Sequence, residues 1–255
     1  MVTKIYRILK SNQLIYGIRP VMEAVRAGRE IEKVFVKKDL KGDLFRELHQ
    51  LLRQRSIPCQ FVPPEKLNRI TGKNHQGVIA LISAIDYQPV ENVVPSLFES
   101  GQVPFLVILD GVTDVRNIGA IARTAACASV HALILPVTGS AQINADAIKT
   151  SAGALNSLPV CRSQDLVRTI IFLKDCGIRV IGATEKADSV YHQVMFDGPV
   201  TLVLGAEDKG ISERVMKVCH DLVKIPVYGN IASLNVSAAA AVFLFEAARQ
   251  RALME

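Results

Sequence analysis

The chain has 255 residues, of which 49% are hydrophobic and none is tryptophan, so it is long enough for one large domain or two ordinary ones with a sizeable core. No apolar run reaches the roughly 18 residues of a membrane-spanning helix, which argues against a membrane protein. The five cysteines and five histidines lack the close spacing of zinc ligands or of a disulfide framework, so we expect reduced thiols and no metal site. The basic N-terminal stretch lacks the continuous apolar segment of a secretion signal, and we therefore expect a cytoplasmic protein.

The positive charge of the chain is unevenly distributed. Residues 1–88 carry 16 Lys and Arg against 8 Asp and Glu, whereas residues 89–255 carry 14 against 16. The excess positive charge therefore lies in the N-terminal third, as a domain that binds a polyanion such as RNA requires. Charge asymmetry alone does not decide the matter, because many basic domains have no such partner.

Helical and strand patterns alternate over the first 85 or so residues, which are therefore expected to form a small α/β unit. The expected elements are a helix at 20–27, a strand at 31–37, a helix at 43–55, and strands at 59–62 and 77–82. Between the last two strands, the loop at 71–77 carries a lysine and two side-chain amides between glycines. This loop is either an RNA contact or a plain solvated turn.

Prolines at positions 89, 95 and 104, with Glu, Asn, Ser and Gly between them, interrupt the regular pattern. This composition predicts a linker over 89–103, part of which, at 93–100, is compatible with a short helix. The linker would separate a basic domain over 1–88, which the family resemblance described below implies is an RNA-substrate-binding domain, from a larger domain over 104–255.

The larger domain alternates apolar runs with helical segments. Strands are expected at 105–109, 132–135, 179–182, 201–204 and 222–225, and helices at 118–128, 145–154, 166–176 and 212–218. This order predicts an α/β fold, with a mainly parallel sheet covered by helices on both faces. Ligands of such sheets bind outside the carboxyl ends of the strands.

Two polar stretches follow strands of this predicted sheet. The first begins after 105–109 and places Asn117 and Arg123 at a loop-to-helix transition, where the arginine fork suits a phosphate or a carboxylate. The second, 205–212, has the glycine spacing of a phosphate loop, but Ile211 stands where that motif needs lysine. We therefore exclude binding of nucleoside triphosphates, and the glycine fingerprint of dinucleotide-binding proteins is also absent.

A third polar stretch, 225–237, leads into an apolar helix rich in small residues. Ser and Asn are favoured at helix starts, because their side chains accept hydrogen bonds from free backbone N–H groups. This stretch has more of them than one cap needs, namely Asn230, Ser233, Asn235 and Ser237. Alone it is either a capped helix or a ligand-binding loop.

Together, the stretches at 117–123, 204–210 and 225–237 resemble the three motifs of the SpoU (TrmH) family of RNA ribose 2′-O-methyltransferases. Residues 16–18, 75–77, 140–145 and 149–154 also resemble the family members that have an N-terminal domain like ribosomal protein L30. That subgroup is typified by the enzyme that methylates a guanosine of 23S ribosomal RNA. The resemblance covers nearly the whole chain and implies S-adenosylmethionine as cofactor, a SPOUT fold with a deep trefoil knot, and a homodimer that packs its C-terminal helices.

The resemblance also implies roles for particular residues. The catalytic-pocket positions of the family are occupied here by Asn117, Arg123, Glu207, Ser233 and Asn235. The positions that hold the methyl donor are occupied by Gly205, Ile225 and Leu234, with Ala183 and Thr184 lining the same pocket.

The reaction implied is attack of a ribose 2′-hydroxyl on the sulfonium methyl group. The family's usual mechanism makes Arg123 the base, but a guanidinium with a pKa above about 12 stays protonated. We therefore expect Arg123 to bind an RNA phosphate, while that phosphate, Glu207 or water accepts the proton. In the expected dimer, Gly119, Ala120 and the alanines at 238–241 would permit close helix packing, although alanine runs also simply favour helix.

Three other functions remain open from the sequence. They are a transfer-RNA guanosine 2′-O-methyltransferase, a drug-resistance methyltransferase of the same architecture, and a non-catalytic RNA-binding or ribosome-assembly factor. The presence of Asn117, Arg123, Glu207 and Asn235 together argues against the last, because a binding module needs none of them as a set.

Overall fold

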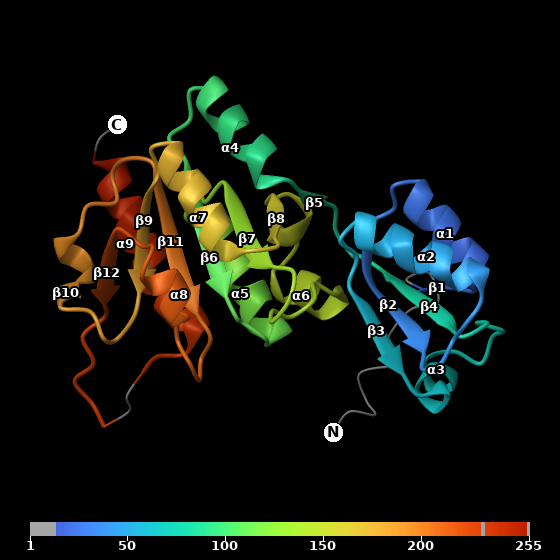
Figure 1. Ribbon diagram of the computed structural model, residues 1–255. Helices are drawn as coiled ribbons and strands as arrows, with labels where there is room; N and C mark the ends of the chain where they lie inside the picture. Colours follow the sequence, from blue (N-terminus) through green and yellow to red (C-terminus); the bar gives the residue numbers. More distant parts are fainter. Residues whose placement is uncertain (1–13, 231–232, 254–255) are drawn as a thin grey trace. The chain divides into compact units, whose positions relative to one another are not determined.

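The computed structural model describes residues 14–230 and 233–253, and the chain forms two compact units that divide between Asp86 and Tyr87 (Figure 1). The basic N-terminal stretch and residues 231 and 232 of the third polar stretch lie outside the described residues. Among the helices that the structure describes, none is long and apolar enough to cross a membrane.

The first unit is a four-stranded mixed sheet with helices on both faces. Its elements in chain order are β1 (Leu14–Tyr16), α1 (Ile18–Arg26), β2 (Ile31–Lys37), α2 (Asp43–Gln54), β3 (Cys59–Val62), α3 (Pro64–Ile70) and β4 (Val78–Ile82). The strand order is β1-β4-β2-β3, in which β2 and β3 are parallel and the other pairs are antiparallel.

Two hydrophobic clusters hold this first unit together. Helices α1 and α2 cover one face, where Val21 and Leu48 are fully buried. On the other face, Leu67 of α3 packs with Phe35 and Ile79 of the sheet. The short strand β1 and helix α3 were not predicted from the sequence, because three residues and seven residues give too little periodicity to detect.

The second unit contains an eight-stranded sheet in which every pair of neighbouring strands is parallel. The strand order is β10-β12-β9-β11-β6-β7-β8-β5. The strands are β5 (Tyr87–Gln88), β6 (Phe105–Asp110), β7 (Ala132–Pro136), β8 (Val160–Ser163), β9 (Arg179–Ala183), β10 (Ser189–Val190), β11 (Val200–Gly205) and β12 (Asp221–Lys224). The predicted α/β fold class with a mainly parallel sheet is confirmed.

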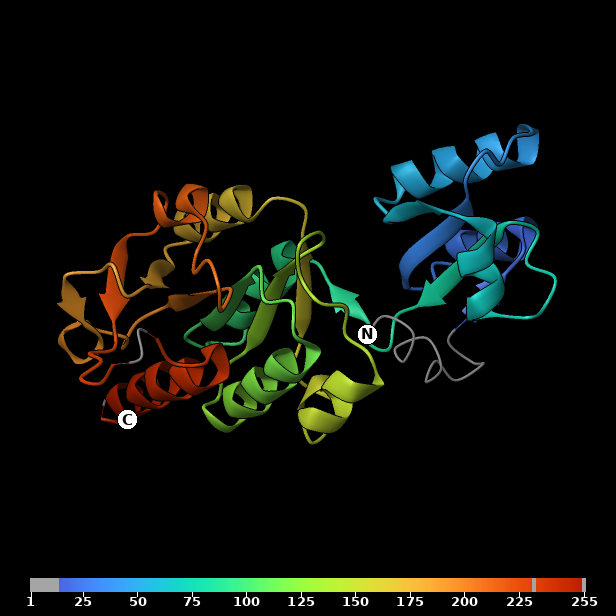
Figure 2. The same ribbon diagram turned by 90° about the horizontal axis from the view of Figure 1, so that it is seen from below.

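Helices cover both faces of this sheet (Figure 2). On one face lie α4 (Val90–Glu99), α7 (Leu166–Asp175) and α8 (Glu213–Met216), whose apolar residues share one buried cluster with the strands. On the other lie α5 (Val115–Cys127), α6 (Ala145–Thr150) and α9 (Val236–Ala252). The first turns of α5 and α9 are reached from loops at the carboxyl edge of the sheet, which places polar groups there.

Most of the expected linker over 89–103 is a helix, so the short helix considered at 93–100 is present and begins earlier. Residues 90–99 form α4, whose Val90, Val93 and Val94 are buried in the core of the second unit. The apolar residues have helical spacing over a longer stretch than the expected 93–100. Pro89 directly precedes the helix, where a missing N–H costs nothing, and Pro95 is accommodated within it.

Gly119 contributes to packing within the chain rather than to a free surface for a dimer. A Cβ atom at this position would lie 2.6 Å from the carbonyl oxygen of Ala147 and 2.7 Å from Cβ of Thr150. The glycine therefore lets α5 approach α6 closely. This corrects the expectation that Gly119 helps to form a contact with a second copy.

Candidate functional site

A cavity of about 380 Å³ lies at the carboxyl ends of three adjacent strands, β9, β11 and β12. Volumes of roughly 300–1,000 Å³ are typical of small-molecule sites. All of the residues expected to hold the methyl donor line this cavity, namely Ala183, Thr184, Gly205, Ile225 and Leu234. Parallel register brings them together, since Leu204 pairs with Ala183 and Val223 pairs with Ala183 from the other side.

The wall formed by residues 205–211 is a tight loop that depends on glycine. Ala206 and Gly210 exchange two backbone hydrogen bonds of 3.1 and 2.8 Å, so the chain folds back directly after β11. A Cβ atom at Gly205 would lie 2.0 Å from the carbonyl carbon of Gly210 and 2.1 Å from the nitrogen of Ile211. A larger residue at 205 would therefore force this loop open.

Asp110 fastens the far end of the same loop to the neighbouring strand. This residue ends β6, and its Oδ2 accepts hydrogen bonds from the backbone N–H (2.8 Å) and the hydroxyl (2.6 Å) of Ser212. The pairing of Gly205 with Asp110 in adjacent parallel strands brings the two segments to the same edge. Asp110 and Ser212 were not identified from the sequence, because an acidic residue at a strand end gives no specific signal.

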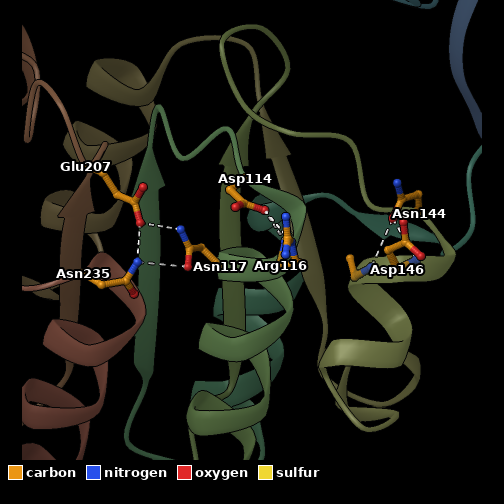
Figure 3. A network of polar contacts seen from close by, with 8 residues as sticks. Asp114, Arg116, Asn117, Asn144, Asp146, Glu207 and Asn235 are labelled. Atoms are coloured by element: carbon orange, nitrogen blue, oxygen red, sulfur yellow. Dashed lines mark hydrogen bonds and ion pairs between the residues drawn. The ribbon is translucent and has the colours of Figure 1, made fainter. Parts of the chain in front are cut away.

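Glu207, in this loop, joins the three polar stretches (Figure 3). The Nδ2 atom of Asn117, in the first turn of α5, donates to Oε1 of Glu207 over 2.5 Å. The Nδ2 atom of Asn235 donates to the same oxygen and, over 3.3 Å, to Oδ1 of Asn117. One carboxylate oxygen therefore accepts from two amides that are 118 residues apart in the chain.

The start of each helix fixes the orientation of its amide. Asn235 caps α9, and its Oδ1 accepts from the backbone N–H (2.9 Å) and the hydroxyl (2.6 Å) of Ser237. The carbonyl end of the amide is thus held in the cap, which turns the Nδ2 end toward Glu207. Asp114 caps α5 by accepting from the backbone N–H of Arg116 over 2.8 Å, which places Asn117 at the third position of the helix.

The other two expected catalytic residues, Ser233 and Arg123, do not belong to the hydrogen-bond network of Glu207. Ser233 lines the cavity and is exposed. Arg123 is exposed on α5 and makes no hydrogen bond or ion pair with any other described residue. At a rise of about 1.5 Å per residue, it lies roughly 9 Å along the helix from Asn117. The structure therefore brings Asn117, Glu207 and Asn235 together and leaves Arg123 outside their network.

The lining of the cavity fits the chemistry of S-adenosylmethionine. Leu204, Val227 and Phe243 provide apolar surface for a ring, and Leu234 adds to it. Charged side chains of both signs suit a ligand that carries an ammonium, a carboxylate and a sulfonium group; they are Glu185, Lys186, Glu207, Asp208, Lys209 and Lys224. Lys186 and Lys224 were not identified from the sequence, because single lysines at strand ends are common.

Two thiols near the sheet are unsuited to nucleophilic catalysis. Burial raises the pKa of Cys219 to about 11 and that of Cys161 to about 12. Because the thiolate is the reactive form, both groups are protonated and inert near neutral pH.

Replacing Gly205 should damage methyl-donor binding. Gly205→Ala should lower the affinity for S-adenosylmethionine by about tenfold or more, because overpacking of this kind costs roughly 1–3 kcal/mol and displaces the cavity wall. Isothermal titration calorimetry measures this change. The control is Gly198→Ala, since a Cβ atom there would meet nothing within 4 Å and affinity should be unchanged. Wild-type affinity in Gly205→Ala would show that the loop does not shape the donor site.

Family models match both units of the chain. The SpoU rRNA methylase family matches residues 104–245. A model described as RNA 2′-O ribose methyltransferase substrate binding matches residues 14–88.

Curated and solved relatives agree with these matches. The 23S rRNA (guanosine-2′-O-)-methyltransferase RlmB of Escherichia coli K12 is 39% identical over 243 residues, which cover 94% of this chain and 99% of that protein. The SpoU methyltransferase AviRb of Streptomyces viridochromogenes, solved with AdoMet, is 25% identical with a TM-score of 0.60 and covers 98% of this chain and 97% of its own. The A. aeolicus TrmH/SpoU tRNA modifying enzyme is 28% identical with a TM-score of 0.56, but covers 64% of this chain and 85% of its own. The chain belongs to the SpoU rRNA methylase family.

Proposed function

We propose that the protein transfers a methyl group from S-adenosylmethionine to the ribose 2′-hydroxyl of a guanosine in 23S ribosomal RNA. The observation that carries this proposal is the cavity at the carboxyl edge of the sheet, which is lined by the donor-site residues and bordered by the network of Glu207. The name of the Escherichia coli relative, which matches almost the full length of both chains, supports ribosomal RNA as substrate.

A transfer RNA is the less favoured substrate. The A. aeolicus tRNA modifying enzyme matches only 64% of this chain, whereas the ribosomal RNA enzyme of Escherichia coli matches 94%. The substrate-binding family model covers the basic first unit. This supports a substrate RNA that the protein also contacts away from the modified nucleotide.

The residues of this chain would divide the chemistry among them. S-adenosylmethionine supplies an electrophilic methyl group when bound. Glu207 is held by Asn117 and Asn235 through Oε1, and its Oε2 accepts no hydrogen bond from another described residue. Glu207 also lines the cavity. We assign Oε2, a backbone phosphate of the RNA or a water molecule as acceptor of the hydroxyl proton. Ser233 would hydrogen-bond the substrate or the donor at the cavity wall.

Arg123 would bind an RNA phosphate. Its guanidinium is exposed and has no partner among the described residues. A fork of donors suits a phosphate, and alignment of the attacking hydroxyl depends on fixing the backbone beside it.

Several further features form part of the same proposal. We assign residues 1–88 to RNA-substrate binding and residues 104–255 to catalysis, place the protein in the cytoplasm, and assign no metal to the site. We also propose the trefoil knot and a homodimer through the C-terminal helix. Phe245 of α9 is a large apolar residue that is 53% exposed in the single chain. Its exposure supports a contact between this face of α9 and a second copy.

A methyl-transfer assay tests the substrate assignment. The full chain is incubated with labelled S-adenosylmethionine and, separately, with 23S ribosomal RNA and transfer RNA, and the labelled nucleotide is mapped. We expect one 2′-O-methylguanosine in 23S ribosomal RNA, which resists alkaline cleavage at that position. Label in transfer RNA alone, or on a base, would contradict the proposal.

Arg123→Lys tests the phosphate contact. Loss of the bidentate fork should lower methyl transfer about tenfold or more, since a charge-assisted hydrogen bond contributes roughly 1.5–3 kcal/mol. Binding of S-adenosylmethionine should be unchanged in calorimetry. The matched control is Arg116→Lys on the same helix, an exposed residue that pairs with Asp114. Wild-type turnover in Arg123→Lys would remove Arg123 from the mechanism.

A further inference from the structure

A second cavity, of about 500 Å³, lies in the first unit. It is lined by residues 72–77 of the loop, by Lys37 and Leu40 at the end of β2 and in the connection after it, and by Pro64 and Asn68 of α3. The loop is built to lie against that connection, because a Cβ atom at Gly77 (φ +82°) would stand 3.2 Å from Cβ of Lys37 and 3.3 Å from Leu40. We refer to this cavity as the loop pocket.

The polar groups of the loop pocket are oriented by a chain of hydrogen bonds that starts at the backbone. The N–H of Gly77 donates to Nδ1 of His75 over 3.0 Å, so Nδ1 is an acceptor and carries no proton. The proton of the neutral ring therefore sits on Nε2, which lies 2.9 Å from Oδ1 of Asn68 and donates to it.

The orientation of Asn68 follows from this tautomer. Because its Oδ1 is committed to His75, its Nδ2 group is left as a fixed pair of donors on the exposed surface of the pocket. Asn74 and Gln76 add two further amides, which make no hydrogen bond to other described side chains. An amide in a fixed orientation, such as that of Asn68, can recognise the edge of a nucleobase, which presents paired donors and acceptors.

The charge of the loop pocket suits a nucleotide rather than a neutral ligand. Lys37 and Lys73 line it, and none of the described residues in its lining is acidic. Lys73 is positioned by the ring of Tyr16, whose centroid lies 5.2 Å from Nζ. The donor cavity of the second unit differs, because both carboxylates and lysines line it. Leu40 and Pro64 give the loop pocket apolar surface against which a base can pack.

We propose that the loop pocket binds a single unstacked nucleotide of the RNA substrate, separate from the nucleotide that is methylated. Lys37 and Lys73 hold its phosphate, and Asn68, set by His75, hydrogen-bonds the edge of its base. This proposal rests on the proposed function, since it takes RNA as the substrate. It makes the first unit a reader of single-stranded RNA rather than a basic surface alone.

Binding of RNA by the full-length protein tests the proposal. Fluorescence anisotropy is measured with a labelled single-stranded RNA and with a fully paired RNA of the same length, over a series of salt concentrations. Asn68→Ala should weaken single-strand binding up to about tenfold, as expected for the loss of a hydrogen bond, and leave the salt slope unchanged. Lys73→Ala should weaken binding and lower the salt slope by about 0.7.

Matched controls lie on the helix α2 of the same unit. Gln54→Ala removes an exposed amide, and Arg53→Ala removes an exposed charge; neither residue lines the loop pocket. Gln54→Ala should bind single-stranded RNA as the wild type does, and Arg53→Ala should affect single-stranded and paired RNA alike. Thermal denaturation of each variant confirms that these surface changes leave the fold intact.

Two outcomes would contradict the proposal that the loop pocket binds a nucleotide. One is equal affinity of Asn68→Ala and Gln54→Ala for single-stranded RNA. The other is an equal loss of affinity for paired and single-stranded RNA in Lys73→Ala, which would show that Lys73 acts only as a nonspecific positive charge. If the wild type methylates RNA in either case, the proposed function stands and only the pocket falls. If the wild type transfers no methyl group to any RNA while Asn68→Ala still loses single-strand binding, the pocket stands and the proposed function falls.

Discussion

The site in the second unit depends on one carboxylate oxygen shared by two amides. Oε1 of Glu207 accepts from Asn117 at the start of α5 and from Asn235 at the start of α9. The three segments come from distant parts of the chain and meet because strands β6, β11, β9 and β12 are parallel neighbours whose carboxyl ends lie at one edge. The helix caps then set the direction of each amide, and the two amides together fix the position of the Glu207 carboxylate.

The same edge holds the donor cavity, which makes the two halves of the site interdependent. The loop that carries Glu207 also forms a wall of the cavity, is closed by the Ala206–Gly210 bridge and is fastened by Asp110 through Ser212. Distortion of this loop would therefore alter methyl-donor binding and the position of the carboxylate together. In a preorganised site of this kind, the free-energy cost of aligning the reactants is met during folding and not during the reaction.

The sequence predicted the parallel fold well, because long apolar runs that alternate with helical segments are a strong signal. The residues expected to hold the methyl donor came from the family resemblance, and they line one cavity. Prediction from the sequence failed where tertiary contacts decide the outcome. The prolines at 89 and 95 favoured a linker with at most a short helix at 93–100, whereas Val90, Val93 and Val94 of α4 pack in the core of the second unit. Gly119 was expected to permit contact with a second copy, but it packs against α6. Asp110 and Ser212 gave no signal because their pairing spans 102 residues. The roles assigned to Arg123 and Ser233 rest on resemblance and stay predictions.

A double-mutant cycle on methyl transfer tests the shared carboxylate most directly. Asn117→Ala removes one amide, and Asn235→Ser removes the other while keeping a residue that caps helix α9. If both amides act through Glu207, the double variant should be little slower than the slower single variant, with a coupling free energy of about 0.5–3 kcal/mol. Independent, additive losses in the two single variants would contradict the account.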